Sequence, residues 1–261
     1  MFADLHVHTT ASDGRLTVPE IPARAREAGV SVVAVTDHDR VHPALDAPVE
    51  VRDGVRVVRG VELRVDTGER RVDLLGYGVD PTEALTAELE RVQRDRVERA
   101  REMVDLVETE TGVTLDLTLE PGVGRPHVAR AVAESAAPHD YGEAFRQLIG
   151  SDRPCYVPRD VTDVETGVAL LRESCGLVSL AHPFRYDDPE AALALCADLD
   201  GVERFYEYGR QVDTAPVSRA VERHDLVPTG GSDAHDHTLG VAGLDRAEWD
   251  RVASRLPGAE S

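Results

Sequence analysis

The stretch Gly29-Val30-Ser31-Val32-Val33-Ala34-Val35-Thr36-Asp37-His38 decides the fold. Residues 30–35 are almost all β-branched or apolar, which is typical of a strand buried on both faces of a parallel sheet. Gly29 ends the helix that we expect over 18–28. Because the strand runs directly into Asp37 and His38, its carboxyl end is a candidate functional site.

The same alternation of short apolar strands and helices continues on both sides of this stretch. Further strands are expected over 2–8, 55–63, 71–77, 177–181, 201–206 and 226–229, and further helices over 165–173, 189–199 and 215–223. This alternation over most of the 261 residues predicts an α/β barrel or an open parallel sheet.

The middle of the chain breaks the alternation. Asp80-Pro81-Thr82-Glu83 has the cap, the proline and the acidic first turn of a helix start, and apolar residues at helical spacing continue to Gly112. Two shorter helices are expected over 128–135 and 141–149. We therefore expect a barrel domain formed by residues 1–80 and 154–261, with a helical subdomain inserted over residues 81–153.

The composition is strongly acidic. The chain has 49 Asp and Glu residues against 29 Lys and Arg, which gives a net charge of −20, and all the basic residues are arginine. An acidic surface keeps a protein hydrated where salt screens charge, so we expect a halophilic, archaeal source. A GC-rich codon bias is an alternative cause of the missing lysine. The charge also argues against a stable complex with nucleic acid.

Other bulk features predict a cytoplasmic protein. No apolar run is long enough to span a membrane, and the first eight residues do not resemble a signal peptide. The three cysteines are far apart and fit no disulfide framework, so we expect reduced thiols.

Candidate metal ligands end or follow five of the expected strands. They are His6 and His8, then His38, Glu62, His182, and the pair Asp233 and His235. His6 and His8 are two residues apart in a strand, so both rings point to the same face. A lone histidine in such a place is more often structural. In a parallel barrel, however, the strand ends meet on one rim, which predicts a single metal site.

These motifs resemble those of the PHP (polymerase and histidinol phosphatase) family. They are the stretches 4–14, Thr36-Asp37-His38, Gly60-Val61-Glu62, Ala181-His182-Pro183 and Gly231-Ser232-Asp233-Ala234-His235. The resemblance extends from residue 2 to about residue 245 and implies a distorted (β/α)7 TIM-like barrel. It also implies a metal-dependent phosphoesterase, a hydrolase of phosphate esters.

The resemblance further implies two or three divalent metal ions, with manganese expected and iron or zinc as alternatives. One ion would be held by His6, His8, Glu62 and Asp233, and another by Asp13, His38 and His235. Glu62 would bridge to a third, together with His182 and Asp73. Relatives usually carry histidine at the position of Asp73, and an aspartate there would favour a harder ion such as Mn²⁺ over Zn²⁺.

Gly124-Arg125-Pro126-His127 resembles a motif of the family branch that contains nucleoside 3′,5′-bisphosphate phosphatases and 5′-to-3′ ribonucleases. It implies that Arg125 and His127 hold phosphate, which suits a guanidinium at a helix start. An exposed arginine in a turn is the structural alternative. Asp37 adjoins a predicted ligand, so it is expected to orient that ligand or to handle protons. Asp37 could equally cap a following helix.

The expected substrate is a phosphorylated small molecule or nucleotide, or a short 5′-phosphorylated oligonucleotide. The expected chemistry is attack on phosphorus by a hydroxide that bridges metal ions. Two alternatives remain open. One is a histidinol-phosphate phosphatase or another small-molecule phosphatase, and the other is a non-catalytic PHP module that binds or regulates.

Overall fold

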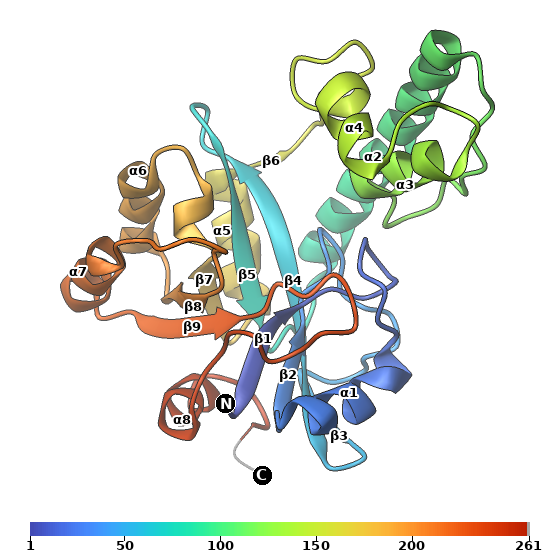
Figure 1. Ribbon diagram of the computed structural model, residues 1–261. Helices are drawn as coiled ribbons and strands as arrows, with labels where there is room; N and C mark the ends of the chain where they lie inside the picture. Colours follow the sequence, from blue (N-terminus) through green and yellow to red (C-terminus); the bar gives the residue numbers. More distant parts are fainter. Residues whose placement is uncertain (260–261) are drawn as a thin grey trace. The chain divides into compact units, whose positions relative to one another are not determined.

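The computed structural model describes residues 1–259, and the chain divides into two compact units (Figure 1). The first unit contains residues 1–88 and the chain from Val161 onward, and the second contains Leu89–Asp160. Each unit is described by itself below. The helical subdomain expected over residues 81–153 stays a prediction, and the second unit covers most of that range.

One mixed sheet forms the first unit. Its seven main strands lie in the order β1-β2-β4-β5-β7-β8-β9. They are β1 (Ala3–Val7), β2 (Val32–Val35), β4 (Val55–Asp66), β5 (Arg71–Tyr77), β7 (Leu177–Leu180), β8 (Gly201–Tyr206) and β9 (Val227–Gly231). Two short strands, β3 (Val49–Arg52) and β6 (Thr162–Asp163), pair with β4 outside this order.

The sheet nearly closes on itself where the end of β9 meets β1 (Figure 1). The backbone N–H of His8 donates to the carbonyl oxygen of Ala234 at 2.9 Å. A β-carbon at position 231 would lie 2.2 Å from the backbone nitrogen of His6, so Gly231 lets the two segments approach this closely. The predicted distorted TIM-like barrel is confirmed.

The sheet is mixed, because β5 pairs antiparallel with both β4 and β7. A tight turn around Gly68 joins β4 to β5, and a hairpin connection makes its two strands antiparallel. Strand β4 is also longer than expected, because it runs to Asp66. Glu62 therefore lies inside a strand and does not end one.

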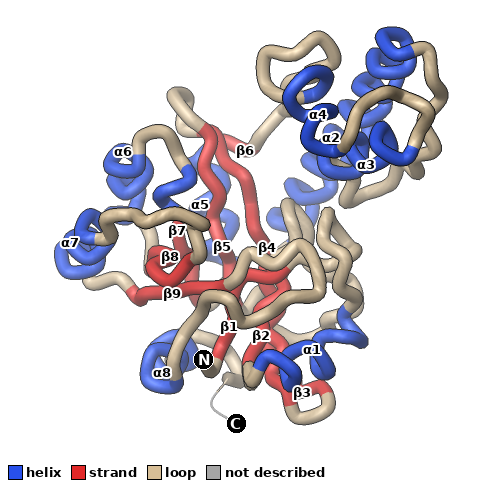
Figure 2. The backbone as a smooth tube through the Cα atoms, in the orientation of Figure 1, coloured by secondary structure: helices blue, strands red, loops and turns tan. Residues whose placement is uncertain are grey.

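Helices lie on the outside of this sheet (Figure 2). They are α1 (Ile21–Ala28), α5 (Val164–Ser174), α6 (Pro189–Leu193), α7 (Ala215–His224) and α8 (Arg246–Ala253). Short 3-10 turns cover Val18–Glu20, Pro183–Arg185 and Ala194–Asp198. One core cluster joins strand residues such as Leu5 and Tyr77 to Trp249 of α8, all of them buried.

The second unit is helical. The long helix α2 (Glu83–Thr111) begins in the first unit and continues here, followed by α3 (Arg125–Glu134) and α4 (Tyr141–Glu143). A π-helical turn, Ala144–Ile149, continues α4. Its core contains Met103, Val107, Val128, Leu148 and Ile149. The unit thus has an apolar core separate from those of the barrel.

Candidate metal centre

The structure brings eight of the nine predicted metal ligands together in three overlapping groups. Within each group the ligand atoms lie within 4.8 Å of one another. The groups are His8, Asp13, His38 and His235; His6, Glu62 and His182; and His6, His8 and Asp233. Asp73, the ninth predicted ligand, belongs to none of these groups.

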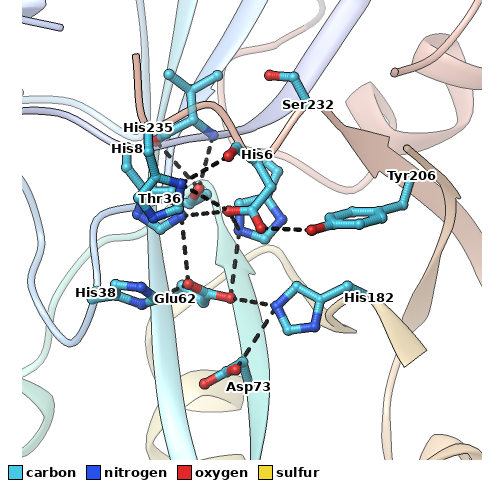
Figure 3. Close-up of polar contacts among 12 residues, drawn as sticks. His6, His8, Thr36, His38, Glu62, Asp73, His182, Tyr206, Ser232 and His235 are labelled. Atoms are coloured by element: carbon cyan, nitrogen blue, oxygen red, sulfur yellow. Dashed lines mark hydrogen bonds and ion pairs between the residues drawn. The ribbon is translucent and has the colours of Figure 1, made fainter. Parts of the chain in front are cut away.

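Glu62 is the centre of this arrangement, and Figure 3 shows it between His38 and His182. Its Oε2 lies 2.6 Å from His38 Nδ1 and 3.5 Å from His8 Nε2. Its Oε1 lies 3.0 Å from His182 Nε2 and 3.4 Å from His6 Nε2. Each oxygen therefore faces a different pair of histidines, as a carboxylate that bridges two ions does.

The donor atoms fit divalent cations. His6 Nε2 and His8 Nδ1 are buried and make no hydrogen bond to any residue that the structure describes. His6 Nε2 also lies 3.4 Å from Asp233 Oδ1. Two ligand atoms that are each about 2.1 Å from one ion are themselves about 3.0–3.5 Å apart. An ion would also remove the cost of burying these nitrogens, about 1–3 kcal/mol each.

The site keeps its carboxylates ionised in the absence of metal. Burial would raise the pKa of Glu62, but His38 and His6 hold it well below its usual range. Burial likewise opposes ionisation of Asp13, whose pKa His38 and His235 hold well below the ordinary value. The pKa of Asp233 is lowered against burial in the same way, by His6 and His8. These negative charges attract cations.

His6 in β1 and His8 directly after it differ in pKa. Burial would lower the pKa of His6, but Glu203, Asp233 and Glu62 raise it well above the ordinary value. The pKa of His8 is lowered by burial and by the nearby His235 and His38. His8 is therefore ready to bind a cation, whereas His6 must first lose a proton.

Backbone geometry aims two of the ligands. His182 and Asp233 have positive φ angles of 27° and 51°, in the left-handed region that residues other than glycine rarely adopt. Such a conformation costs roughly 1–3 kcal/mol and persists only where the surrounding structure enforces it. Each residue lies two positions beyond the end of a strand, β7 or β9, so the turn points its side chain into the site.

Two buried carboxylates that sequence reasoning missed hold these ligands in place. Glu203 of β8 is fully buried, accepts a hydrogen bond from His6 Nδ1 at 3.0 Å and accepts another from the backbone N–H of His182 at 2.7 Å. Asp4 of β1 accepts from the backbone N–H and the hydroxyl of Ser232, beside Asp233. The feature of the sequence that could have revealed these two carboxylates is an acidic residue inside an otherwise apolar strand.

Asp233 is held through its second oxygen. Its Oδ2 accepts from the hydroxyl of Tyr206 at 2.8 Å and from Arg185 Nη1 at 2.7 Å. Figure 3 shows Tyr206 pointing toward the cluster from the β8 side. These contacts leave Oδ1 directed at His6 and His8, at 3.4 Å and 3.0 Å.

Asp37 is buried beside the cluster, and both its carboxylate oxygens are engaged. Oδ1 accepts from the backbone N–H of Thr9 at 2.8 Å and from the hydroxyl of Ser12 at 2.6 Å, while Oδ2 accepts from the hydroxyl of Thr9 at 2.7 Å. Asp37 thus fixes the loop that carries Asp13. It caps no helix, because the next element after it along the chain is the strand β3. Its predicted part in catalysis stays a prediction.

Arg125 and His127 open helix α3 in the second unit. The backbone N–H of Gly124 donates to His127 Nδ1 at 3.2 Å, so the neutral ring carries its proton on Nε2. The guanidinium of Arg125 lies over the rings of Phe145 and Tyr156, at 5.9 Å and 6.0 Å from their centroids. Neither residue is a ligand of the barrel cluster, and their phosphate-binding roles stay predictions.

A barrel that gathers histidines and carboxylates around places for divalent ions is typical of metal-dependent hydrolases. Residues 4–150 match the model of the PHP domain family. The chain is 29% identical, over 97% of both chains, to a 3′,5′-nucleoside bisphosphate phosphatase of Chromobacterium violaceum. It is 29% identical to a 5′-3′ exoribonuclease of Haemophilus influenzae over 89% of both.

A phosphoribosyl 1,2-cyclic phosphate 1,2-diphosphodiesterase of Eggerthella lenta is 32% identical over 90% of this chain and 94% of its own. The solved structure of an amidohydrolase from Chromobacterium violaceum, with sulfate bound, superposes with a TM-score of 0.80. The two chains are 27% identical, and the superposition covers the full length of both.

The chain therefore belongs to the PHP domain family. The predicted class of enzyme, a metal-dependent phosphoesterase that hydrolyses phosphate esters, is confirmed. Among the described residues, no helix is long and apolar enough to cross a membrane.

Proposed function

We propose that this enzyme uses two or three divalent ions, with Mn²⁺ preferred over Fe or Zn, to hydrolyse phosphate esters of nucleotides or of short 5′-phosphorylated oligonucleotides. The observation that carries the proposal is the position of Glu62. Its two oxygens face separate pairs of histidines within 3.5 Å, which suits a carboxylate shared by two ions.

Bound divalent ions would supply a water activated at neutral pH and would neutralise phosphate oxygens. The chain's own residues determine where this happens. Glu203 keeps the proton of neutral His6 on Nδ1, which leaves Nε2 for a cation. Tyr206 and Arg185 fix Asp233 through Oδ2. Asp37 fixes the Thr9–Ser12 loop and hence the position of Asp13.

The ligand set supports the choice of metal. Imidazole suits Zn and Fe, whereas carboxylate oxygens favour harder ions such as Mn²⁺. Three ionised carboxylates, those of Asp13, Glu62 and Asp233, accompany the histidines of the three groups. No cysteine belongs to these groups, so the soft thiolate ligand that would favour zinc is missing from this set of described residues.

The nucleotide substrate is supported first by the relatives, two of which are named for action on nucleoside bisphosphates or RNA. The second support is a cluster of arginines within the helical unit of this acidic chain. Burial, together with the nearby Arg125, Arg159 and Arg96, lowers the pKa of Arg99 to about 10. Cations held this close together favour an anion among them, and phosphate is the anion that guanidinium binds in bidentate fashion.

In this proposal Arg125 and His127 bind the phosphate of the substrate and stabilise charge in the transition state. The Nε2–H of neutral His127 can donate to a phosphate oxygen. The rings of Phe145 and Tyr156 support the guanidinium of Arg125 by cation–π contact.

A substrate panel tests the proposal. Purified full-length protein loaded with Mn²⁺ is assayed for release of phosphate or of mononucleotides from five compounds: a nucleoside 3′,5′-bisphosphate, a 5′-phosphorylated trinucleotide, a nucleoside 5′-monophosphate, histidinol phosphate and p-nitrophenyl phosphate. We expect kcat/KM for the first two to exceed the others by at least about tenfold, or about 1.4 kcal/mol in the barrier. Preference for histidinol phosphate would reject the nucleotide assignment while leaving the phosphoesterase class intact.

We also infer a halophilic, archaeal source and a cytoplasmic location. The net charge of −20 supports the first inference. The second is supported by the three cysteines, all of which are free thiols, since disulfides are rare in the cytosol.

A further inference from the structure

Arg64 and Asp73 face each other across the antiparallel strands β4 and β5. Arg64 Nε donates to Asp73 Oδ1 at 2.7 Å, and Arg64 Nη2 donates to Asp73 Oδ2 at 2.6 Å. The Asp73 side chain is only 1% exposed. Both oxygens of this buried carboxylate are therefore engaged by one guanidinium in a bidentate pair, the strongest form of this contact.

This pair changes what Asp73 can do for the metal centre. His182 Nε2 lies 3.0 Å from Glu62 Oε1 but 3.8 Å from Asp73 Oδ2. A third ion bound by Asp73, Glu62 and His182 would share the oxygens of Asp73 with a guanidinium already on both of them. Two cations on one carboxylate in a buried place repel each other strongly.

Arg64 is also held firmly in position. Its backbone N–H donates to Asp39 Oδ1 at 3.0 Å, and the backbone N–H of Asp39 in turn donates to the carbonyl oxygen of Glu62 at 2.7 Å. Arginine remains protonated in proteins. The site thus has a permanent positive charge beside Glu62.

We propose that Arg64 takes the place of one metal ion, so that the centre of this enzyme is dinuclear. The guanidinium neutralises Asp73 and removes it from the ligand set, so the remaining ligands, Glu62 among them, would hold two ions. Only two of the five N–H groups of Arg64 bind Asp73, and its side chain is 36% exposed. Its other N–H groups can meet a phosphate oxygen where a third ion would otherwise do so. This inference rests on the metal centre proposed above.

Metal stoichiometry tests the proposal without any activity assay. Metal-free full-length protein is titrated with Mn²⁺ by calorimetry, and elemental analysis after gel filtration gives the ions retained per chain. We expect about two ions in the parent. Arg64→Ala frees Asp73 and should bind about three, whereas Arg64→Ala combined with Asp73→Ala should return to about two. Arg64→Lys keeps the positive charge and should remain at about two.

Arg71→Ala is the matched control, because Arg71 lies on β5 and pairs with Asp66 at the surface. Arg71→Ala should bind the same number of Mn²⁺ ions per chain as the parent does. Circular dichroism and thermal melts establish that each variant is folded, and Arg64→Gln replaces Arg64→Ala if the latter is not. Three ions per chain in the parent would overturn the role of Arg64, and so would two ions per chain in folded Arg64→Ala or Arg64→Gln. A parent that binds no ion would instead reject the metal centre itself.

Discussion

Glu203 Oε1 and His6 Nδ1 lie 3.0 Å apart, and neither side chain has any exposed surface. The other oxygen of Glu203 accepts from the backbone N–H of His182, which follows a different strand. One buried carboxylate thus fixes two of the proposed ligand positions. Carboxylates that accept from a metal-binding histidine orient its ring and raise its basicity.

Glu203→Gln should therefore weaken metal binding while leaving the fold intact. The amide can still accept one hydrogen bond, but it lacks the charge that favours the proton on Nδ1 of His6. We expect a loss of roughly 10–100-fold in Mn²⁺ affinity, measured by competition with a fluorescent chelator. Glu222→Gln, an exposed change of the same kind on α7, is the control. Equal affinity in the parent and Glu203→Gln would refute the positioning role.

The charge of His6 predicts how metal affinity depends on pH. In the metal-free protein the pKa of His6 is raised well above its ordinary value by Glu203, Asp233 and Glu62, against the effect of burial. A cation can bind Nε2 only after the proton leaves, so affinity should rise with pH as the solution approaches that raised pKa. Calorimetry in two buffers of different ionisation enthalpy should detect at least about one proton released per chain at neutral pH. No proton release would contradict the assignment.

Loss of a ligand should remove metal and activity together. His8→Ala removes a donor from two of the overlapping groups, and Asp233→Ala removes a donor from one of them. Each variant should contain less metal per chain, as measured by elemental analysis. Chelator should abolish the activity of the parent, and Mn²⁺ should restore it. An active protein that contains no transition metal would reject the metal hypothesis.

Much of the barrel could be predicted because its strands are local features. The run 30–35 is mostly β-branched, and its last four residues form β2, while the expected bounds of β8 match the observed Gly201–Tyr206. The ligands that follow strands could be located for the same reason. The pairing of strands is not a local feature, because the antiparallel direction of β5 depends on the turn before it and on a partner strand, β7, far along the chain.

The residues that support the ligands could not be found in this way. Arg64 and Asp73 are nine residues apart and meet only because the β4–β5 register places them opposite each other. Glu203 reaches His6 across a separation of 197 residues. No spacing rule connects such residues, and the only hint in the sequence is a charged residue within a buried strand.

Salt should stabilise this protein. At a net charge of −20, repulsion between like charges opposes the folded state at low ionic strength, and salt screens it over roughly 3 Å at 1 M. Thermal melts from low to molar KCl should therefore show a rising midpoint. A flat or falling midpoint would reject adaptation to high salt and leave codon bias as the explanation for the absence of lysine.

Arg125 tests the substrate class separately from the metal chemistry. Lysine keeps the charge but loses the planar fork, so Arg125→Lys should already slow the turnover of a nucleoside bisphosphate. Arg125→Ala should raise the barrier for kcat/KM by about 2–4 kcal/mol if the contact strengthens in the transition state. Metal content should remain normal in both variants, because Arg125 belongs to none of the ligand groups.

Arg130→Ala is the matched control for Arg125, because it changes another arginine of helix α3. A general loss of positive charge or of helix stability would affect both variants, whereas a specific phosphate contact would affect Arg125 alone. The ratio of kcat/KM for the bisphosphate to that for p-nitrophenyl phosphate separates these cases, since the small substrate lacks the second phosphate. If Arg125→Ala hydrolyses the bisphosphate as well as the parent does, the nucleotide assignment loses its main support within this chain, and a small-molecule phosphatase becomes the better description.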